Sequence, residues 1–177
     1  MTQRSERGFT LIELLVAVAI VGIVAGIAAP QLLRARSAGN EAAAVASLRA
    51  IHSGQASYAS TCARGGYAQT LDDLARLPVG GSSGFVSPDL SRNGVVKSGY
   101  VLNVGSGVTA TVILASANTC NGAADDALAS YFGEAHPTSV GSTGQRSFGL
   151  DQRGTVFQEP TGVTFTNVFP ASATPIQ

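Results

Sequence analysis

The N-terminal part of the chain changes sharply from polar to apolar. From Phe9 to Ala29 every residue is apolar or glycine except Thr10 and Glu13, and Pro30 follows this run. As an α-helix the run would be about 31 Å long, which matches the ~30 Å hydrocarbon core of a bilayer. The pattern therefore predicts a helix of membrane-spanning length over residues 9–30.

Strong helix formers continue beyond Pro30, which predicts one long helix from Phe9 to Ser60. The part of this helix after Pro30 is amphipathic. One stripe carries the large apolar side chains, interrupted by Gln55, and is predicted to pack against a sheet: Val45, Leu48, Ile51 and Tyr58.

A second stripe, on the opposite side of the same helix, holds only small residues: Ala43, Ser47, Ala50, Gly54 and Ser57. Small side chains allow neighbouring helices to pack closely, but alanine is also a good exposed helix former. Because glycine costs about 1 kcal/mol in a helix, Gly54 favours the interpretation as a packing face. Both interpretations remain open from the sequence.

Beyond Ser60 the chain changes to glycine-rich turns and short alternating segments. Thr70 followed by Asp73 is typical of a helix N-cap. We therefore expect a short helix that runs through Leu71, Leu74 and Leu77, followed by a loop of glycine and serine over residues 80–84.

Alternation of apolar and polar residues predicts strands at Tyr100–Val104, Val108–Ala115, Ser130–Ala135, Arg146–Leu150 and Thr155–Gln158, and an edge strand around Val163, Phe165 and Phe169. The first two strands should form a hairpin through Gly105-Ser106-Gly107. Gln152-Arg153-Gly154 should turn the chain between Arg146–Leu150 and Thr155–Gln158. A long helix followed by such strands predicts the α+β class, with an antiparallel sheet head covered on one face by the helix.

Charge and composition exclude several classes of function. The chain has 11 Lys and Arg against 11 Asp and Glu, and Lys97 is its one lysine, so no nucleic-acid partner is expected. Two cysteines cannot build a cysteine zinc site, and Asp125-Asp126 lack the surrounding ligands of a calcium loop. His52 and His136 belong to no catalytic motif. We expect no enzyme activity, no cofactor and no metal.

Glu13 is the one charged residue in the apolar run. A carboxylate within a membrane helix costs a few kcal/mol and is by default a functional candidate. Alternatively, Glu13 marks the start of the helix, where the positive end of the helix dipole favours an acid. The residue itself does not decide between the two.

The segment RGFTLIELLVAVAIVGIVAGIAAPQLLRARSAGNEAAAVASLRAI resembles the N-terminus of the type IV pilin and pseudopilin family. Gly8–Phe9 matches the prepilin cleavage site, Phe9 the N-methylated first residue, and Glu13 the glutamate at the fifth mature position. Gly22 and Pro30 match the residues that weaken the family's helix. The resemblance is strong over about 60 residues and looser in the head.

The resemblance implies a structural subunit with a single-pass inner-membrane stage and an extracellular pilus stage. A prepilin peptidase and N-methyltransferase would process Gly8–Phe9, and the inner-membrane assembly machinery would then transfer the subunit from lipid to a filament of its own copies. In the filament Glu13 would pair with the Phe9 amine of a neighbour, fixing the axial register. Gly22 and Gly26 could allow close helix contact, or could weaken the helix with Pro30 so that it unwinds locally.

The expected organisation has four parts: a cleaved leader over residues 1–8, a transmembrane and filament-core helix over 9–30, an amphipathic helix over 31–60, and a globular head over 61–177. An exported chain with two cysteines favours a disulfide between Cys62 and Cys120, whereas two free thiols are the alternative. In the loop-entropy model the bond stabilises by about 4 kcal/mol.

Two other functions remain open. A minor pilin, or a pseudopilin of type II secretion, would share the same N-terminus. The chain ends in NVFPASATPIQ, without the calcium-rich ending of a major pseudopilin, which disfavours the secretion function. A membrane-tethered periplasmic binding module is the alternative from another class, but the sequence contains no set of convergent polar residues for it.

Overall fold

The computed structural model describes residues 8–109 and 111–176. Contacts within the chain divide it into two compact units, one ending at Arg36 and one beginning at Ser37. A single helix, α1 (Leu11–Thr61), runs through both units without a break. The long helix predicted over Phe9–Ser60 is therefore confirmed, with ends that differ by one or two residues.

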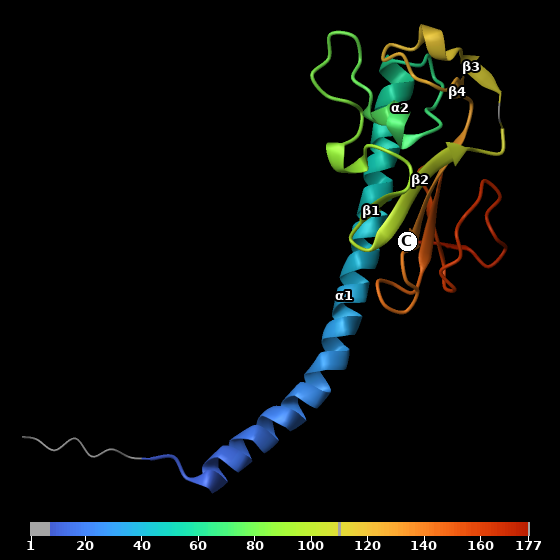
Figure 1. Cartoon of the computed structure of the whole chain (residues 1–177). Helices are drawn as coiled ribbons and strands as arrows, with labels where there is room; N and C mark the ends of the chain where they lie inside the picture. The colour runs from blue at the N-terminus through green and yellow to red at the C-terminus, as the bar shows by residue number, and fades with distance from the viewer. Residues whose placement is uncertain (1–7, 110, 177) are drawn as a thin grey trace, which may run out of the picture. The chain divides into compact units, whose positions relative to one another are not determined.

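The head unit contains a six-stranded sheet in which all neighbouring strands are antiparallel (Figure 1). In spatial order the strands are β1 (Val95–Lys97), β2 (Tyr100–Ser106), β5 (Tyr131–Pro137), β6 (Ser147–Asp151), β7 (Val156–Glu159) and β8 (Thr174–Pro175). A second, two-stranded sheet pairs β3 (Val112–Leu114) with β4 (Ala127–Leu128). With the long helix, these sheets confirm the α+β class.

The part of α1 from Ser37 onward packs on one face of the large sheet (Figure 1). Leu48, Ile51 and Tyr58 are fully buried, and Val45 is half-buried against the same core, as the apolar stripe predicts. Burying each large apolar side chain contributes about 1.5–3 kcal/mol. The sheet residues in this core alternate along their strands: Tyr100, Leu102, Val104, Tyr131, Ala135, Phe148, Leu150 and Val156.

The opposite face of the sheet is covered in part by the C-terminal segment. Phe165 lies over Gly149 of β6, where a side chain would collide with its ring. The ring of Phe169 packs edge-to-face on both Phe165 and Phe157 of β7, at centroid distances of 5.0 and 5.2 Å. Such edge-to-face pairs add about 0.5–1.5 kcal/mol each beyond the burial of their area.

A short helix, α2 (Leu71–Ala75), begins at the predicted cap, where the Thr70 hydroxyl accepts a hydrogen bond from the Asp73 N–H. Leu77 lies beyond the end of α2 and is exposed, so its predicted place in the helix is wrong. Two 3₁₀ turns complete the regular elements, η1 (Pro88–Leu90) and η2 (Ser116–Asn118).

Cys62 and Cys120 form a disulfide, which confirms the predicted bond. The residue after α1 is thereby joined to the loop that follows η2. The Cys120 N–H also donates to the Cys62 carbonyl at 3.4 Å, and the Asn121 amide donates to the Asp73 carbonyl at 2.7 Å. The disulfide and these hydrogen bonds together hold the end of α1, α2 and the η2 loop as one cluster.

The predicted hairpin through Gly105-Ser106-Gly107 is wrong. β2 pairs with β1 and β5, whereas β3 belongs to the small sheet. Beyond β2 the chain binds Ser130 instead: the Gly107 N–H donates to the Ser130 carbonyl at 3.2 Å, and the Ser130 hydroxyl donates to the Thr109 carbonyl at 2.7 Å. These contacts continue the β2–β5 pairing, and because β1 occupies the other edge of β2, no edge is left for β3.

The edge strand expected around Val163, Phe165 and Phe169 is also wrong. This stretch has no strand, and the terminal strand β8 lies further along the chain. The alternation of aromatic and polar residues there reflects rings that pack onto the outer face of the sheet, rather than pairing of the backbone with its edge.

Candidate functional site

The predicted processing junction lies ahead of the first helical residue. Gly8 is exposed, and Phe9 has 84% of its surface exposed. Both residues precede the start of α1 at Leu11, so their backbone is accessible and not held in a helix. Accessible, non-helical backbone is the kind that proteases cleave. The remaining leader positions, residues 1–7, lie outside the described residues.

Thr10 begins the helix as its N-cap. Its hydroxyl accepts a hydrogen bond from the Glu13 N–H at 3.3 Å, and its carbonyl accepts one from the Leu14 N–H at 3.3 Å. Sequence reasoning missed this role and treated Thr10 only as an interruption of the apolar run. The spacing Thr-x-x-Glu is itself a signal for the start of a helix, so the residue could have been found.

Glu13 lies in the first turn of α1 with its side chain exposed. An acid at this position interacts favourably with the free N–H groups of the helix end. Within the described ranges 8–109 and 111–176, none of the ion pairs includes Glu13. This position fits a residue that stabilises the N-terminus of the helix. It also leaves the carboxylate available to a group from outside the described residues.

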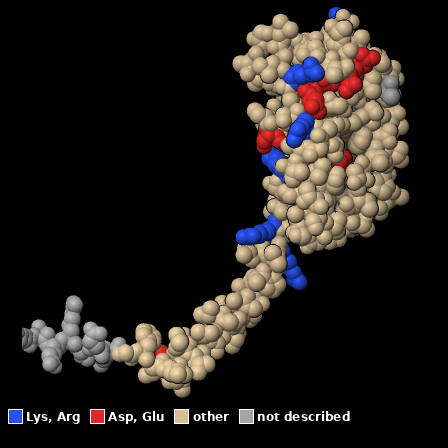
Figure 2. Space-filling model, in the orientation of Figure 1, with Lys and Arg blue, Asp and Glu red and all other residues tan. Residues whose placement is uncertain are grey.

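The surface behind Glu13 is apolar on every side. Each residue from Gly8 to Arg36 is exposed, and Glu13 is the one charged residue between Gly8 and Arg34 (Figure 2). By length and composition, α1 can cross a membrane. Water-soluble monomers rarely expose a continuous apolar surface of this size. The segment therefore requires cover from lipid or from other protein chains.

Gly22, Gly26 and Pro30 all lie inside regular α-helix. The isolated chain shows no local unwinding between Gly22 and Pro30, and unwinding on leaving lipid stays a prediction. Pro30 removes only its own N–H, and the turns on both sides remain helical. In the described part of the chain, a Cβ added to either glycine would meet nothing within 4 Å. A role for both in contacts between helices stays a prediction.

The stripe of small residues is not one exposed face, which corrects the expectation for its members. Ser47 and Gly54 are buried in the head and Ala43 is half-buried, whereas Ala50 and Ser57 are exposed. A Cβ on Gly54 would lie 2.6 Å from the carbonyl oxygen of Phe85. The close approach of the Phe85 loop therefore explains why a glycine stands at position 54. Among the proposed assembly residues on this stripe, Ala50 is exposed and remains accessible to a neighbouring chain.

The strongest polar link between α1 and the sheet was also missed from the sequence. Glu41 on α1 is buried and forms an ion pair with Arg146, with Nη2 at 2.6 Å and Nε at 2.8 Å from Oε2. Oε1 accepts the N–H groups of Gln145 at 3.0 Å and Arg146 at 3.2 Å. Burial raises the pKa of Glu41, but these hydrogen bonds outweigh it and hold the pKa below its ordinary value.

Gln55 interrupts the apolar stripe because its side-chain amide forms hydrogen bonds with the backbone of Ala68. Its amide N–H donates to the Ala68 carbonyl at 2.7 Å, and its amide oxygen accepts the Ala68 N–H at 2.9 Å. A fully buried amide is tolerated when both of its ends are paired in this way. The contacts of Gln55 and Glu41 with other segments of the chain position the head on the helix.

The other chemical candidates remain dispersed. The His52 ring lies 2.7 Å from the Tyr131 hydroxyl, and His136 lies 2.9 Å from the carboxylate of Glu134. Among the described residues, no group of three or more His, Cys, Asp or Glu side chains is arranged to hold a metal ion.

Comparisons with known proteins point to the N-terminal segment. A family model described as the prokaryotic N-terminal methylation motif matches residues 3–29. The type IV major pilin protein PilA of Myxococcus xanthus (strain DK1622) is 36% identical over 77 residues, which are 44% of this chain and 34% of the relative. The matched part thus spans about a third of that relative's length. No solved structure matches the chain.

These findings agree with the fold. The methylation motif covers the predicted cleavage junction and the apolar helix, and the long helix followed by an antiparallel sheet is the architecture that the resemblance implies. The identity to a pilin extends beyond the motif alone. The N-terminal part of the chain is therefore similar to that of type IV pilins.

Proposed function

We propose that the chain is a structural subunit of a type IV pilus. It is held in the inner membrane by one helix, cleaved between Gly8 and Phe9, methylated on the Phe9 amine, and polymerised into a filament of identical copies. Residues 1–8 act as the leader, 9–30 as the membrane and filament-core helix, 31–60 as the helix that carries the head, and 61–177 as the head. The relative's name, a major pilin, supports this choice.

One observation carries the proposal: a fully exposed apolar helix that bears a single acid in its first turn, directly behind an exposed Gly-Phe junction. Lipid can cover the apolar surface before assembly, and the helices of neighbouring copies can cover it afterwards. A change from lipid to protein surroundings keeps the apolar area out of water in both states.

Cleavage after Gly8 would give Glu13 a partner. The new amine on Phe9 is positive, and N-methylation keeps it positive at neutral pH. Phe9 and Glu13 are four positions apart in the sequence, so a carboxylate that pairs with the amine of a neighbouring copy fixes the axial offset between the two copies. In surroundings of low dielectric constant an unpaired carboxylate is strongly penalised, which disfavours every other register.

The test compares Glu13→Ala with Leu14→Ala in a bacterium that assembles pili. Leu14 is the adjacent position, is also exposed and serves as the matched control. We expect Glu13→Ala to remain in the membrane fraction and to be cleaved, with mass spectrometry showing methylated Phe9 as the first residue. Sheared filaments should decrease more than about tenfold, because the loss of a buried partner costs several kcal/mol. Leu14→Ala should assemble.

Different results would overturn different parts of the proposal. Normal filaments from Glu13→Ala would remove the pairing role while leaving the subunit role intact. A native chain that still begins at Met1 and forms no filament would exclude the pilus subunit itself. Trace incorporation into filaments built from another chain would identify a minor pilin instead.

A further inference from the structure

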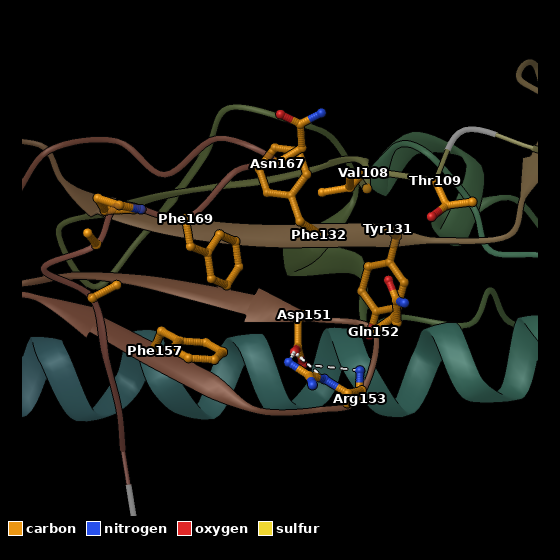
Figure 3. A pocket seen from close by; sticks show the side chains of 14 residues that line it. Val108, Thr109, Tyr131, Phe132, Asp151, Gln152, Arg153, Phe157, Asn167 and Phe169 are labelled. Carbon is orange, nitrogen blue, oxygen red and sulfur yellow. Dashed lines mark hydrogen bonds and ion pairs between the residues drawn. The ribbon is translucent and has the colours of Figure 1, made fainter.

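A cavity of about 520 Å³ opens on the face of the sheet that lies away from α1 (Figure 3). It lies where the β6–β7 turn and the start of β5 meet the C-terminal loop. This volume is within the range of pockets that bind small molecules, about 300–1,000 Å³. Its lining includes three phenylalanines and several polar side chains, among them Phe132, Phe157, Phe169, Gln152, Arg153 and Asn167.

The aromatic part of the cavity is fixed by packing. Phe132 has room for its ring because its cross-strand partner is Gly105, where a Cβ would lie 2.7 Å from the ring. Phe157 and Phe169 meet edge-to-face at 5.2 Å, and Phe165 holds Phe169 from the other side at 5.0 Å. A ligand would therefore meet rings that are already in place, which lowers the entropic cost of binding.

The charged residues of the cavity neutralise each other. The carboxylate of Asp151 pairs with the Arg153 side chain, with Nη2 at 2.6 Å and Nε at 2.8 Å, and it also accepts the N–H groups of Arg153 and Thr155 (Figure 3). Neither charge remains unpaired for a ligand. The cavity is thus unsuited to an ionic ligand, which would need an opposite charge there.

Neutral hydrogen-bonding groups do remain available at the rim. The side-chain amides of Gln152 and Asn167 are exposed and make no hydrogen bond within the described residues. Each amide offers two N–H donors and one oxygen acceptor. Rings below and unpaired amides at the edge make a site that is apolar on one side and polar on the other.

We infer that this cavity binds a neutral saccharide. A pyranose ring has the same two-sided character, because its C–H faces can lie on aromatic rings while its hydroxyls both donate to and accept from amides. A purely apolar ligand would leave the amides at the rim unused. Binding here would not depend on filament formation, so it goes beyond the proposed pilus function and can fail separately from it.

The test is calorimetric titration of the full chain in dodecylphosphocholine micelles, a detergent without a sugar headgroup. Cellobiose, lactose and N,N′-diacetylchitobiose are the probes, with glucuronate as an ionic probe and indole as an apolar one. We expect saturable binding of at least one neutral disaccharide. Val108→Trp, at an exposed position on the cavity wall, should weaken that binding at least about tenfold by filling the entrance.

Val79→Trp is the matched control, because Val79 is 94% exposed and does not line the cavity. It should bind like the unchanged chain. Asn167→Ala removes one rim amide from an exposed loop and should weaken binding about three- to tenfold, the effect of one hydrogen bond. Because this substitution removes no buried contact, it keeps the test decisive if Val108→Trp does not fold.

Three results would overturn the inference. The first is that no neutral disaccharide binds. The second is that only indole or only glucuronate binds, which would identify an apolar or an ionic site. The third is that a folded Val108→Trp or Asn167→Ala chain binds a disaccharide as tightly as the unchanged chain, which would place the saccharide elsewhere.

Discussion

The two halves of α1 have the same backbone structure and opposite surroundings. From Leu11 to Arg36 every side chain is exposed, whereas the part from Ser37 to Thr61 buries nine residues in the head. Helices in proteins owe most of their stability to packing of an apolar face, and only the second half finds such packing within its own chain. The first half must obtain its partners from outside. Substitutions in the two halves should therefore change different properties of the protein.

The largest expected effect is on the head alone. Replacing Cys62 and Cys120 together by serine should lower its free energy of unfolding by about 4 kcal/mol, because the bond closes a loop across a sequence separation of 58. Urea denaturation followed by near-ultraviolet circular dichroism measures the loss. The membrane fraction of the chain should not change. An unchanged urea midpoint would show that the disulfide is dispensable.

A matched pair of leucines tests the two halves directly. Leu48→Ala should destabilise the head by about 3 kcal/mol, since it empties a fully buried position in the core. Leu15→Ala removes the same atoms from a side chain that is 61% exposed and should change head stability by less than about 0.5 kcal/mol. Thermal unfolding of both chains in micelles provides the comparison. Equal losses of stability in Leu48→Ala and Leu15→Ala would contradict the division of α1 into a half packed on the head and an exposed half.

Acid should weaken the contact between helix and sheet. The pKa of Glu41 is lowered in the folded chain, so its ion pair with Arg146 stabilises the head above the ordinary glutamate pKa. That contribution is lost as the pH falls from about 4 through the lower, folded-state pKa. Glu41→Gln should lower stability at pH 7 by about 2 kcal/mol and flatten this acid dependence. The free energy of unfolding of both chains, measured from pH 7 to pH 3, tests both effects. If it falls with the same slope in the unchanged and the Glu41→Gln chain, Glu41 is not the cause of the acid dependence.

The smallest effect on stability is expected on the exposed side of α1 between Ser37 and Thr61. Ala50→Arg should change the free energy of unfolding by less than about 0.5 kcal/mol, because Ala50 is exposed and arginine favours helix. If this side faces another copy in the filament, the added bulk and charge should reduce sheared filaments strongly. Ala50→Ser, which adds little volume and no charge, is the control. Normal filaments from Ala50→Arg would exclude this face from assembly.

The sequence predicts the helix and most of the sheet because their signals are local. The apolar run, the Leu48 stripe and the Thr70 cap each depend on spacing within a few residues, and each is present as predicted. The failures concern contacts between distant segments. The two edges of β2 pair with β1 and β5, which leaves no place for a hairpin, and Phe165 folds onto β6; no local pattern indicates either contact.

The candidate site shows the same division. Gly8, Phe9 and Glu13 stand in a short motif, so sequence and resemblance find them together. Gly54 was assigned to an outer packing face because the loop at Phe85 that covers it lies 31 residues away in the sequence. Glu41 was overlooked because its partner Arg146 is 105 residues away. A single sequence does not reveal pairings of such long range.

The unbroken course of α1 has a mechanical consequence. Within the head unit, a pull that arrives along the chain at Ser37 enters through helical backbone that continues to Thr61. The helix ends at Thr61, and the next residue, Cys62, is joined to Cys120 by the disulfide. Tension entering at that point is shared between two stretches of backbone, so the head should resist being unravelled from the end at which the load arrives.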